Sequence, residues 1–186
     1  FQALHPDWTF VTWASSDALE WMSPTLREVF DWQLTWAGRA DVVRYAVIQR
    51  FGGVYVDTDV EALRPFDDLL DGAPFAAWED RNLLCPTVIG AEPGHPAMTD
   101  LLRALPGWAR RRKTMPPNHQ TGPYFFTRQW AKRRDVRLLD PVTFYPVGWW
   151  EKSKLGGPYP AESYAVHHWD AGWLENGPPQ YDREGR

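Results

Sequence analysis

The apolar and polar positions change their period several times along the chain, which predicts helices alternating with strands. Between residues 38 and 51, apolar side chains recur every three or four positions, as on one face of an amphipathic helix. This stripe consists of Ala40, Val43, Val47 and Phe51. Gly52 and Gly53 follow, and glycine accepts the left-handed conformation that ends many helices. "VYV" at 54–56 then predicts a short buried strand.

The rest of the chain alternates in the same way. Ser15-Ser16-Asp17 offers a helix N-cap, and Pro24 stands where a second helix can begin. Further helices are predicted at 96–113, with Pro106-Gly107 as a break or boundary, and at 124–134. Runs of β-branched and aromatic residues predict strands at 8–13, 74–79, 85–92, 136–139, 143–147 and 164–169. No repeat or linker interrupts the pattern, so we expect one mixed α/β domain over residues 1–186, with a loose polar tail at 175–186.

Composition and charge exclude some classes of protein. The chain has 186 residues, of which 44% are hydrophobic and 24% charged, as in globular domains. Its net charge of −4 gives no electrostatic case for nucleic-acid binding. Two basic runs, at 110–113 and 132–134, predict either solvated helix faces or a patch for an anionic partner. The twelve tryptophans mildly favour a carbohydrate or nucleotide pocket, although core packing accounts for most aromatic residues.

Cysteine usage and hydropathy bear on location. Cys85 is the only cysteine, so the chain forms no internal disulfide, which suits a reducing compartment. No apolar run approaches the roughly 18 residues that span a bilayer, and no charged-then-apolar leader is present. We therefore expect a cytoplasmic protein by default. Removal of an upstream anchor stays open as an alternative, because the sequence begins at Phe1 and not at Met.

A pair of aspartates stands at the carboxyl end of the 54–56 strand. Alternate side chains of an extended chain point the same way, so Asp57 and Asp59 face one side and Thr58 the other. Open α/β sheets bind ligands at the carboxyl ends of their strands. Two close carboxylates repel unless a cation lies between them, and hard divalent cations prefer carboxylate oxygens. The pair therefore indicates a Mg²⁺ or Mn²⁺ site that takes phosphate oxygens, or else a simple turn.

Asp41 and Arg44 are neighbours on one face of the predicted helix, beside its apolar stripe. One interpretation is a salt bridge within the helix, which at a surface contributes only about 0–1 kcal/mol. The other follows from the helix running directly into the glycine turn and the strand before Asp57. In that case both side chains reach the same crevice, the arginine binding a phosphate and the aspartate a sugar hydroxyl.

Residues 38–70 join these features in one pattern, Asp-x-x-Arg-Tyr, a helix, and Gly-Gly-x-Tyr-x-Asp-x-Asp. The positions are filled by Asp41, Arg44, Tyr45, Gly52, Gly53, Tyr55, Asp57 and Asp59. Later stretches agree with it: "GHP" at 94–96, "TGP" at 121–123, "FYP" at 144–146 and "HHWDAGW" at 167–173. The chain thereby resembles the DXD-containing sugar-binding region of the family 32 glycosyltransferases. Relatives include the yeast initiating α-1,6-mannosyltransferase, capsular polysaccharide glycosyltransferases and the glucosylating domains of clostridial toxins.

The resemblance implies a GT-A fold, which is a Rossmann-like nucleotide-sugar-binding domain. It implies transfer of a hexose from a UDP- or GDP-linked donor to a glycan or other hydroxyl acceptor, with retention of configuration, as in polysaccharide biosynthesis. Arg44, Asp57 and Asp59 are the expected catalytic residues, with no protein base. The implied donor-binding residues are Asp41, Arg44, Gly53, Tyr55, Asp57 and Trp173, and the implied metal ligands are Asp57, Asp59 and His168.

Adjacent histidines on a strand face opposite sides, so one of His167 and His168 is expected to face the site. Imidazole is a reasonable Mn²⁺ ligand, and we expect His168 because relatives supply a ligand there. The alternative is one buried and one solvent-facing histidine without a metal. The loop at 115–126 offers Asn118, His119 and Gln120 either to the acceptor or to a plain surface turn.

The chain also departs from the family pattern. Ala171-Gly172 replaces a serine that would contact the diphosphate, and Pro86-Thr87 stands where relatives often have an asparagine. The strand that supports the nucleotide base in relatives is not at the start of this sequence. We therefore expect either that a segment upstream of this sequence supplies it or that the base pocket is incomplete. Two other functions therefore stay open, a nucleotide-sugar-binding module without turnover and a metal-dependent phosphoesterase. The second would need more carboxylate and histidine ligands, for two metals.

Overall fold

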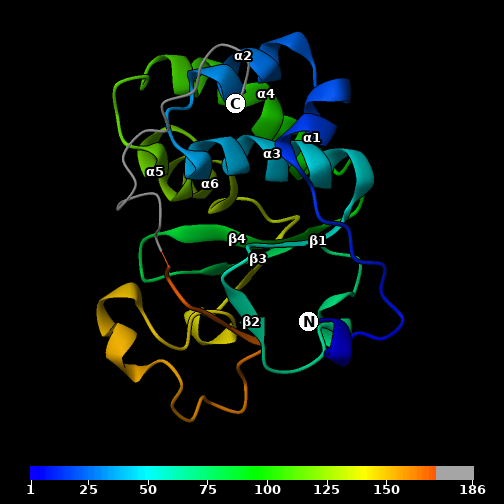
Figure 1. Cartoon of the computed structure of the whole chain (residues 1–186), viewed down its shortest axis with the longest axis vertical. Coiled ribbons are helices and arrows are strands. Elements are labelled where there is room, and N and C mark those ends of the chain that lie inside the picture. The colour runs from blue at the N-terminus through cyan, green and yellow to red at the C-terminus, as the bar shows by residue number, and fades with distance from the viewer. Residues whose placement is uncertain (171–186) are drawn as a thin grey trace.

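The computed structural model describes residues 1–170, and it places the α-helices together on one face of a β-sheet (Figure 1). The helices are α1 (Ser15–Trp21), α2 (Pro24–Trp32), α3 (Trp36–Phe51), α4 (Pro96–Arg110), α5 (Pro117–Gln120) and α6 (Pro123–Trp130). The strands are β1 (Gly53–Val56), β2 (Val60–Ala62), β3 (Phe75–Trp78), β4 (Leu84–Ala91), β5 (Arg137–Leu139) and β6 (Ala165–His167). Short 3₁₀ turns occupy Gln2–Leu4, Asp67–Leu69, Pro141–Thr143 and Trp149–Lys154.

The main sheet has four strands in the order β1-β4-β3-β5. β4 is antiparallel to both β1 and β3, whereas β3 and β5 are parallel. A separate antiparallel ribbon joins β2 to β6, with Val60 opposite His167. β2 lies on the side of the sheet away from the helices (Figure 1). The expected mixed α/β class, with a sheet that contains parallel strands, is confirmed.

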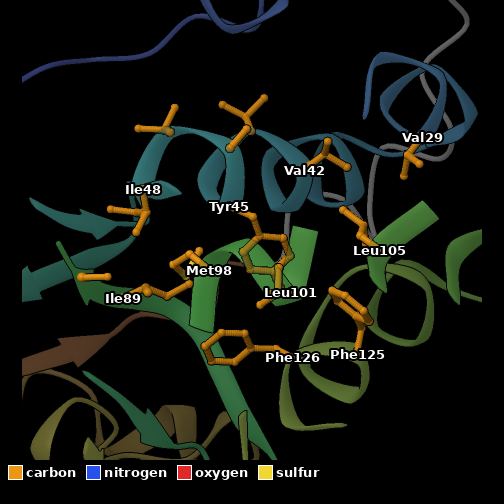
Figure 2. Close-up of a cluster of buried hydrophobic side chains, with 14 of the residues drawn as sticks. Val29, Val42, Tyr45, Ile48, Ile89, Met98, Leu101, Leu105, Phe125 and Phe126 are labelled. Atoms are coloured by element: carbon orange, nitrogen blue, oxygen red, sulfur yellow. The ribbon is translucent and has the colours of Figure 1, made fainter. Parts of the chain in front are cut away.

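Two apolar clusters cover the two faces of β4, which is why all eight of its residues are buried. The larger cluster lies between the sheet and helices α1–α4 and α6, and Figure 2 shows Tyr45, Met98, Leu101 and Phe126 meeting there. The smaller cluster includes Phe66, Phe75 and Phe144. β4 is therefore the strand that the two apolar clusters share.

Local sequence determines both ends of α3. The side chain of Thr35 accepts a hydrogen bond from the Gly38 N–H at 3.2 Å, which caps the first turn. Gly52 ends the helix with φ 67°, a conformation that side chains with a Cβ resist. The predicted apolar stripe is too narrow, because every residue from 41 to 48 is buried. Asp41 and Arg44 are therefore inside the protein. They form the salt bridge of the first interpretation, with Nη2 of Arg44 3.5 Å from Oδ1 of Asp41, but this salt bridge is buried and not at the surface.

Three predicted elements differ in the structure. Residues 8–13 and 143–147 form no strand, although their composition favours one; 9–14 is an irregular segment, and Pro141–Thr143 is a 3₁₀ turn. Strand composition is not sufficient where no neighbouring strand offers a ladder of hydrogen bonds. Pro106 does not break α4 but lies inside it. Leu101, Leu105 and Ala109 form a buried stripe along α4, and this packing outweighs the hydrogen bond lost at the proline.

Two further findings concern the chain beyond the main sheet. The strand β2 was not predicted from the sequence, and its pairing with β6 carries the C-terminal "HH" segment back to the aspartates. Within residues 1–170, no helix has the length and apolar character needed to cross a membrane.

Candidate functional site

Asp57, Asp59 and His167 converge at the junction between β1 and the β2–β6 ribbon. Each contributes one ligand atom, and these three atoms lie within 4.8 Å of one another. The convergence does not come from strand alternation as expected, because Thr58 and Asp59 form a turn between β1 and β2. It comes from the β2–β6 register, which brings Nε2 of His167 to 3.1 Å from Oδ2 of Asp59.

Asp57 is held in one orientation by two donors. Its Oδ1 accepts a hydrogen bond from the Tyr55 hydroxyl at 2.8 Å and lies 3.0 Å from Nη2 of Arg44. Among residues 1–170, Oδ2 of Asp57 accepts no hydrogen bond. The carboxylate is thus fixed through one oxygen while the other stays available to a ligand.

Arg44 is a buried cation between two carboxylates. Its side chain is 5% exposed, and Nη1 donates to the Pro86 carbonyl at 2.7 Å. Nη2 lies 3.0 Å from Asp57 and 3.5 Å from Asp41. Burial alone would lower the pKa of Arg44, but Asp57 and Asp41 hold it well above the ordinary value. Its Nε is buried without a hydrogen-bond partner in the described part of the chain, so one donor remains unused.

Asp41 lies behind Arg44 and is bound to the loop before α6. Its Oδ2 accepts a 2.7 Å hydrogen bond from the Thr121 hydroxyl, and Thr121 is fully buried. The Tyr45 hydroxyl holds the same loop by donating to the Thr121 carbonyl at 2.8 Å. Burial raises the pKa of Asp41 from 3.8 to about 6, although Arg44 and the Thr121 hydrogen bond act to lower it.

Asp59 has the opposite electrostatic environment. Partial burial acts to raise the pKa of Asp59, but the hydrogen bond and charge of His167 and the Asp170 N–H produce a net lowering. The Asp170 N–H donates to Oδ2 of Asp59 at 3.1 Å. Asp59 is therefore a carboxylate that the fold keeps ionised, which suits a metal ligand.

The structure corrects the choice between the two histidines. His167 is buried and faces the aspartates, and its ring centroid lies 4.1 Å from that of Trp169. His168 points to the other side of β6, where its Nε2 lies 3.0 Å from Glu61 Oε2 with the side chain 36% exposed. Alternation along β6 gives the two rings opposite faces, and the pairing of Val60 with His167 decides which ring faces inward.

Of the other predicted residues, Tyr55 lies at the site and Gly53 does not. Gly53 begins β1 and pairs with Ala91, about 13 Å along the strand from Asp57. Its φ of 90° gives it a conformational role in the turn instead of a contact with the site. Trp173, with Ala171 and Gly172, lies outside the described residues. Thr121 and the Pro86 carbonyl hold the site but had no local sequence signal beyond the short "TGP" stretch, because their partners are 80 and 42 residues away.

The donor set fits a hard divalent cation. Two carboxylates and one imidazole match the ligand preference of Mn²⁺ and, through the oxygens, of Mg²⁺. Nε2 of His167 is the ring atom that faces the carboxylates, since it lies 3.1 Å from Oδ2 of Asp59. Nδ1 of the same ring is buried and lacks a hydrogen-bond partner among the described residues. Three protein ligands leave coordination positions for the oxygens of a bound molecule.

The chain is similar in sequence to known glycosyltransferases. Residues 1–76 match the family described as "Glycosyltransferase sugar-binding region containing DXD motif". Inositol phosphoceramide mannosyltransferase 3 of Schizosaccharomyces pombe is 32% identical over 197 residues, covering 89% of this chain and 52% of that protein. Mannosyl phosphorylinositol ceramide synthase CSH1 of Saccharomyces cerevisiae is 27% identical over 159 residues, covering 76% of this chain and 41% of that protein. This chain thus spans about half the length of the curated relatives it matches.

A solved structure, the PaToxG Glycosyltransferase, overlaps 63% of this chain and 43% of its own, with a TM-score of 0.49 and 15% identity.

Asp57 and Asp59 lie inside the stretch that matches the family. The expected resemblance is therefore confirmed: residues 1–76 match the sugar-binding region of glycosyltransferases that contains the DXD motif.

Proposed function

We propose that the protein is a metal-dependent glycosyltransferase with a GT-A-type fold. It moves a hexose from a nucleotide-sugar donor to a hydroxyl acceptor and retains the anomeric configuration. The observation that carries the proposal is the convergence of Asp57, Asp59 and His167 beside Arg44, inside the stretch that matches the glycosyltransferase region. The donor sugar proposed first is mannose, because the relatives named above are mannosyl-transferring by name.

Asp57, Asp59 and His167 would hold Mn²⁺ or Mg²⁺ in this proposal. Such an ion, when bound, offsets the charge of a nucleoside diphosphate as that group leaves. Tyr55 and Arg44 orient Asp57, so the carboxylate meets its ligand without reorganisation. Arg44 also keeps a positive charge beside the site at every working pH, which favours an anionic leaving group.

Asp41 and Thr121 give the donor side of the site its shape. The Thr121 hydroxyl and Arg44 hold the Asp41 carboxylate on the buried side of the arginine. The role of Asp41 and Arg44 as donor-sugar ligands, and of Tyr55 in the nucleotide pocket, is part of the proposal. Among residues 1–170, only one group of three metal-ligating side chains is present. A phosphoesterase with two metals would require more, so transfer is the function we propose.

The test measures sugar transfer and donor hydrolysis with a panel of GDP-mannose, UDP-galactose and UDP-N-acetylglucosamine. Wild type is compared with Asp57→Asn and Asp59→Asn, with Mn²⁺ and with chelator. We expect one donor to be consumed in a Mn²⁺-dependent manner and each variant to lose at least about 100-fold, the scale of a lost charge-stabilising group. Full activity in either variant, or in chelator, would contradict the proposal. Donor binding by calorimetry without any product would indicate a binding module.

A further inference from the structure

The residues of the candidate metal site are carried by two different sheets. Asp57 belongs to the main sheet, because it follows β1 and its N–H donates to the Thr87 carbonyl of β4 at 2.9 Å. Asp59 and His167 belong to the β2–β6 ribbon, where the His168 N–H donates to the Asp59 carbonyl at 2.8 Å. Metal–ligand distances vary by only about 0.2 Å. An ion therefore meets all three ligands only while the ribbon keeps a fixed spacing from the main sheet.

Tyr145 bonds to the main sheet through its hydroxyl and packs against the ribbon through its ring. The hydroxyl shares a 2.7 Å hydrogen bond with the Thr87 hydroxyl and donates to the Cys85 carbonyl at 3.3 Å, both on β4. The ring centroid of Tyr145 lies 6.1 Å from that of His167 and 5.7 Å from that of Trp169. Burial raises the pKa of Tyr145 well above its ordinary value, so the hydroxyl stays protonated.

The segment that carries Tyr145, residues 143–147, holds the ribbon at two further points. Just before β6, the Tyr164 N–H donates to the Thr143 carbonyl at 2.8 Å. Just after β6, the Trp169 indole N–H donates to the Val147 carbonyl at 2.8 Å. The segment therefore follows β6 from one end to the other, and Tyr145 is the residue in its middle.

Trp169 shows that these contacts hold the end of the ribbon against backbone strain. Its φ is 56°, and it is the one non-glycine residue with a positive φ among those that the structure describes. A bulky residue keeps this conformation only where its surroundings fix it. For Trp169 these surroundings are the His167 ring, 4.1 Å away between centroids, and the Val147 carbonyl.

We infer that Tyr145 fixes the spacing between Asp57 on the main sheet and His167 on the ribbon, and that it is thereby a positioning residue of the metal site. Thr87 transmits the effect, since its carbonyl bonds to the Asp57 N–H and its hydroxyl to Tyr145. This inference rests on the proposed function, of which the metal site is a part. It also gives a role to the "FYP" stretch at 144–146, which the sequence connected only with the family pattern. Ligands that are already in place need not be reordered when the ion binds.

The first test measures Mn²⁺ binding by the full chain, from the loss of the free-ion electron paramagnetic resonance signal. Tyr145→Phe and Thr87→Val each remove one partner of the same hydrogen bond and keep the shape of the side chain. We expect each to weaken Mn²⁺ binding about five- to tenfold. The double variant should be no weaker than either single variant, because one hydrogen bond is lost in all three. Thr87→Ser keeps the hydroxyl and should bind Mn²⁺ within about twofold of wild type.

Tyr164→Phe is the matched control for Tyr145→Phe. It makes the same change in a tyrosine just before β6, whose ring packs against Phe66 and the Arg64 guanidinium. We expect it to change Mn²⁺ binding less than about twofold. Wild-type Mn²⁺ binding in Tyr145→Phe would overturn the inference. So would effects of Tyr145→Phe and Thr87→Val that multiply in the double variant.

A second test needs no metal and separates this inference from the proposed function. Hydrogen exchange at the Asp57 N–H reports on the main sheet, and exchange at the His168 N–H reports on the ribbon. We expect Tyr145→Phe to speed exchange about tenfold at His168 and less than about threefold at Asp57, because the ribbon then opens separately from the sheet. If the wild type binds no Mn²⁺, the proposed metal site fails, yet this exchange ratio still decides whether Tyr145 sets the spacing. Equal acceleration at the two N–H groups, or none at either, would show that it does not.

Discussion

The hydrogen bond from Thr121 to Asp41 gives the most quantitative test of how the site is held together. Thr121 is fully buried, and its hydroxyl donates to Oδ2 of Asp41 at 2.7 Å. Thr121→Val keeps the shape of the side chain and removes this donor. Asp41 would then keep only Arg44, at 3.5 Å, as a partner for its buried carboxylate.

The size of the effect follows from the charge of the acceptor and from burial. A hydrogen bond to a charged group contributes about 1.5–3 kcal/mol, and removal of one partner leaves the other desolvated. We expect Thr121→Val to lower the free energy of unfolding by about 2 kcal/mol. Thr121→Ser retains the hydroxyl and loses one buried methyl group, which costs about 1 kcal/mol.

The assay is urea denaturation at pH 7.5, with Asp41→Ala and the double variant completing a mutant cycle. The cycle isolates the coupling between the two side chains, which we expect to be about 1.5 kcal/mol or more. A coupling below about 0.5 kcal/mol, with Thr121→Val no less stable than Thr121→Ser, would refute this view of the site.

Three further predictions concern the titration of Asp41, the orientation of Asp57 and the packing of Phe75 against Gly90. The folded pKa of Asp41, about 6, lies above its unfolded value of 3.8, so its stabilising contribution is complete below pH 3.8 and is lost as pH rises through 6. Urea melts should therefore show that the free energy of unfolding of Asp41→Asn, relative to that of wild type, rises by about 2–3 kcal/mol between pH 4 and pH 7.5. Parallel pH profiles of the two proteins would contradict this prediction. Tyr55→Phe removes the hydroxyl that orients Asp57, so calorimetry should show Mn²⁺ affinity about tenfold weaker; unchanged affinity would count against that role. Gly90→Ala would place a methyl group against the Phe75 ring, so thermal unfolding should show a loss of about 1–3 kcal/mol, and an unchanged Tm would contradict this packing.

Features set by neighbouring residues could be predicted from the sequence. The helix before the glycine pair, the glycine turn and the strand that leads to Asp57 all follow from local periodicity and from the conformational freedom of glycine. Thr35 as N-cap and Gly52 as C-cap give α3 its ends within two residues of the predicted bounds. The central DXD pattern was equally visible, because all its residues lie within one short stretch.

Features set by pairing between residues far apart in the sequence could not be predicted. The choice of His167 over His168 depends on the register between β6 and β2, a three-residue strand without its own sequence signal. A slip of one residue exchanges the two rings, so no argument from β6 alone decides between them. Likewise, Asp41 is buried only because residues distant in sequence, including Thr121, cover it. Residues 8–13 show the converse, since their strand-like composition found no partner strand.

The central claim is that Asp57, Asp59 and His167 together bind a divalent cation. Its most direct test is Mn²⁺ binding, followed by the loss of the free-ion electron paramagnetic resonance signal, in wild type, His167→Ala and His168→Ala. The two variants are matched, because they remove the same ring from adjacent positions of the β6 segment. We predict that His167→Ala weakens Mn²⁺ binding at least about tenfold and that His168→Ala changes it less than about threefold. Equal binding in wild type and His167→Ala, or a larger loss in His168→Ala, would contradict the account.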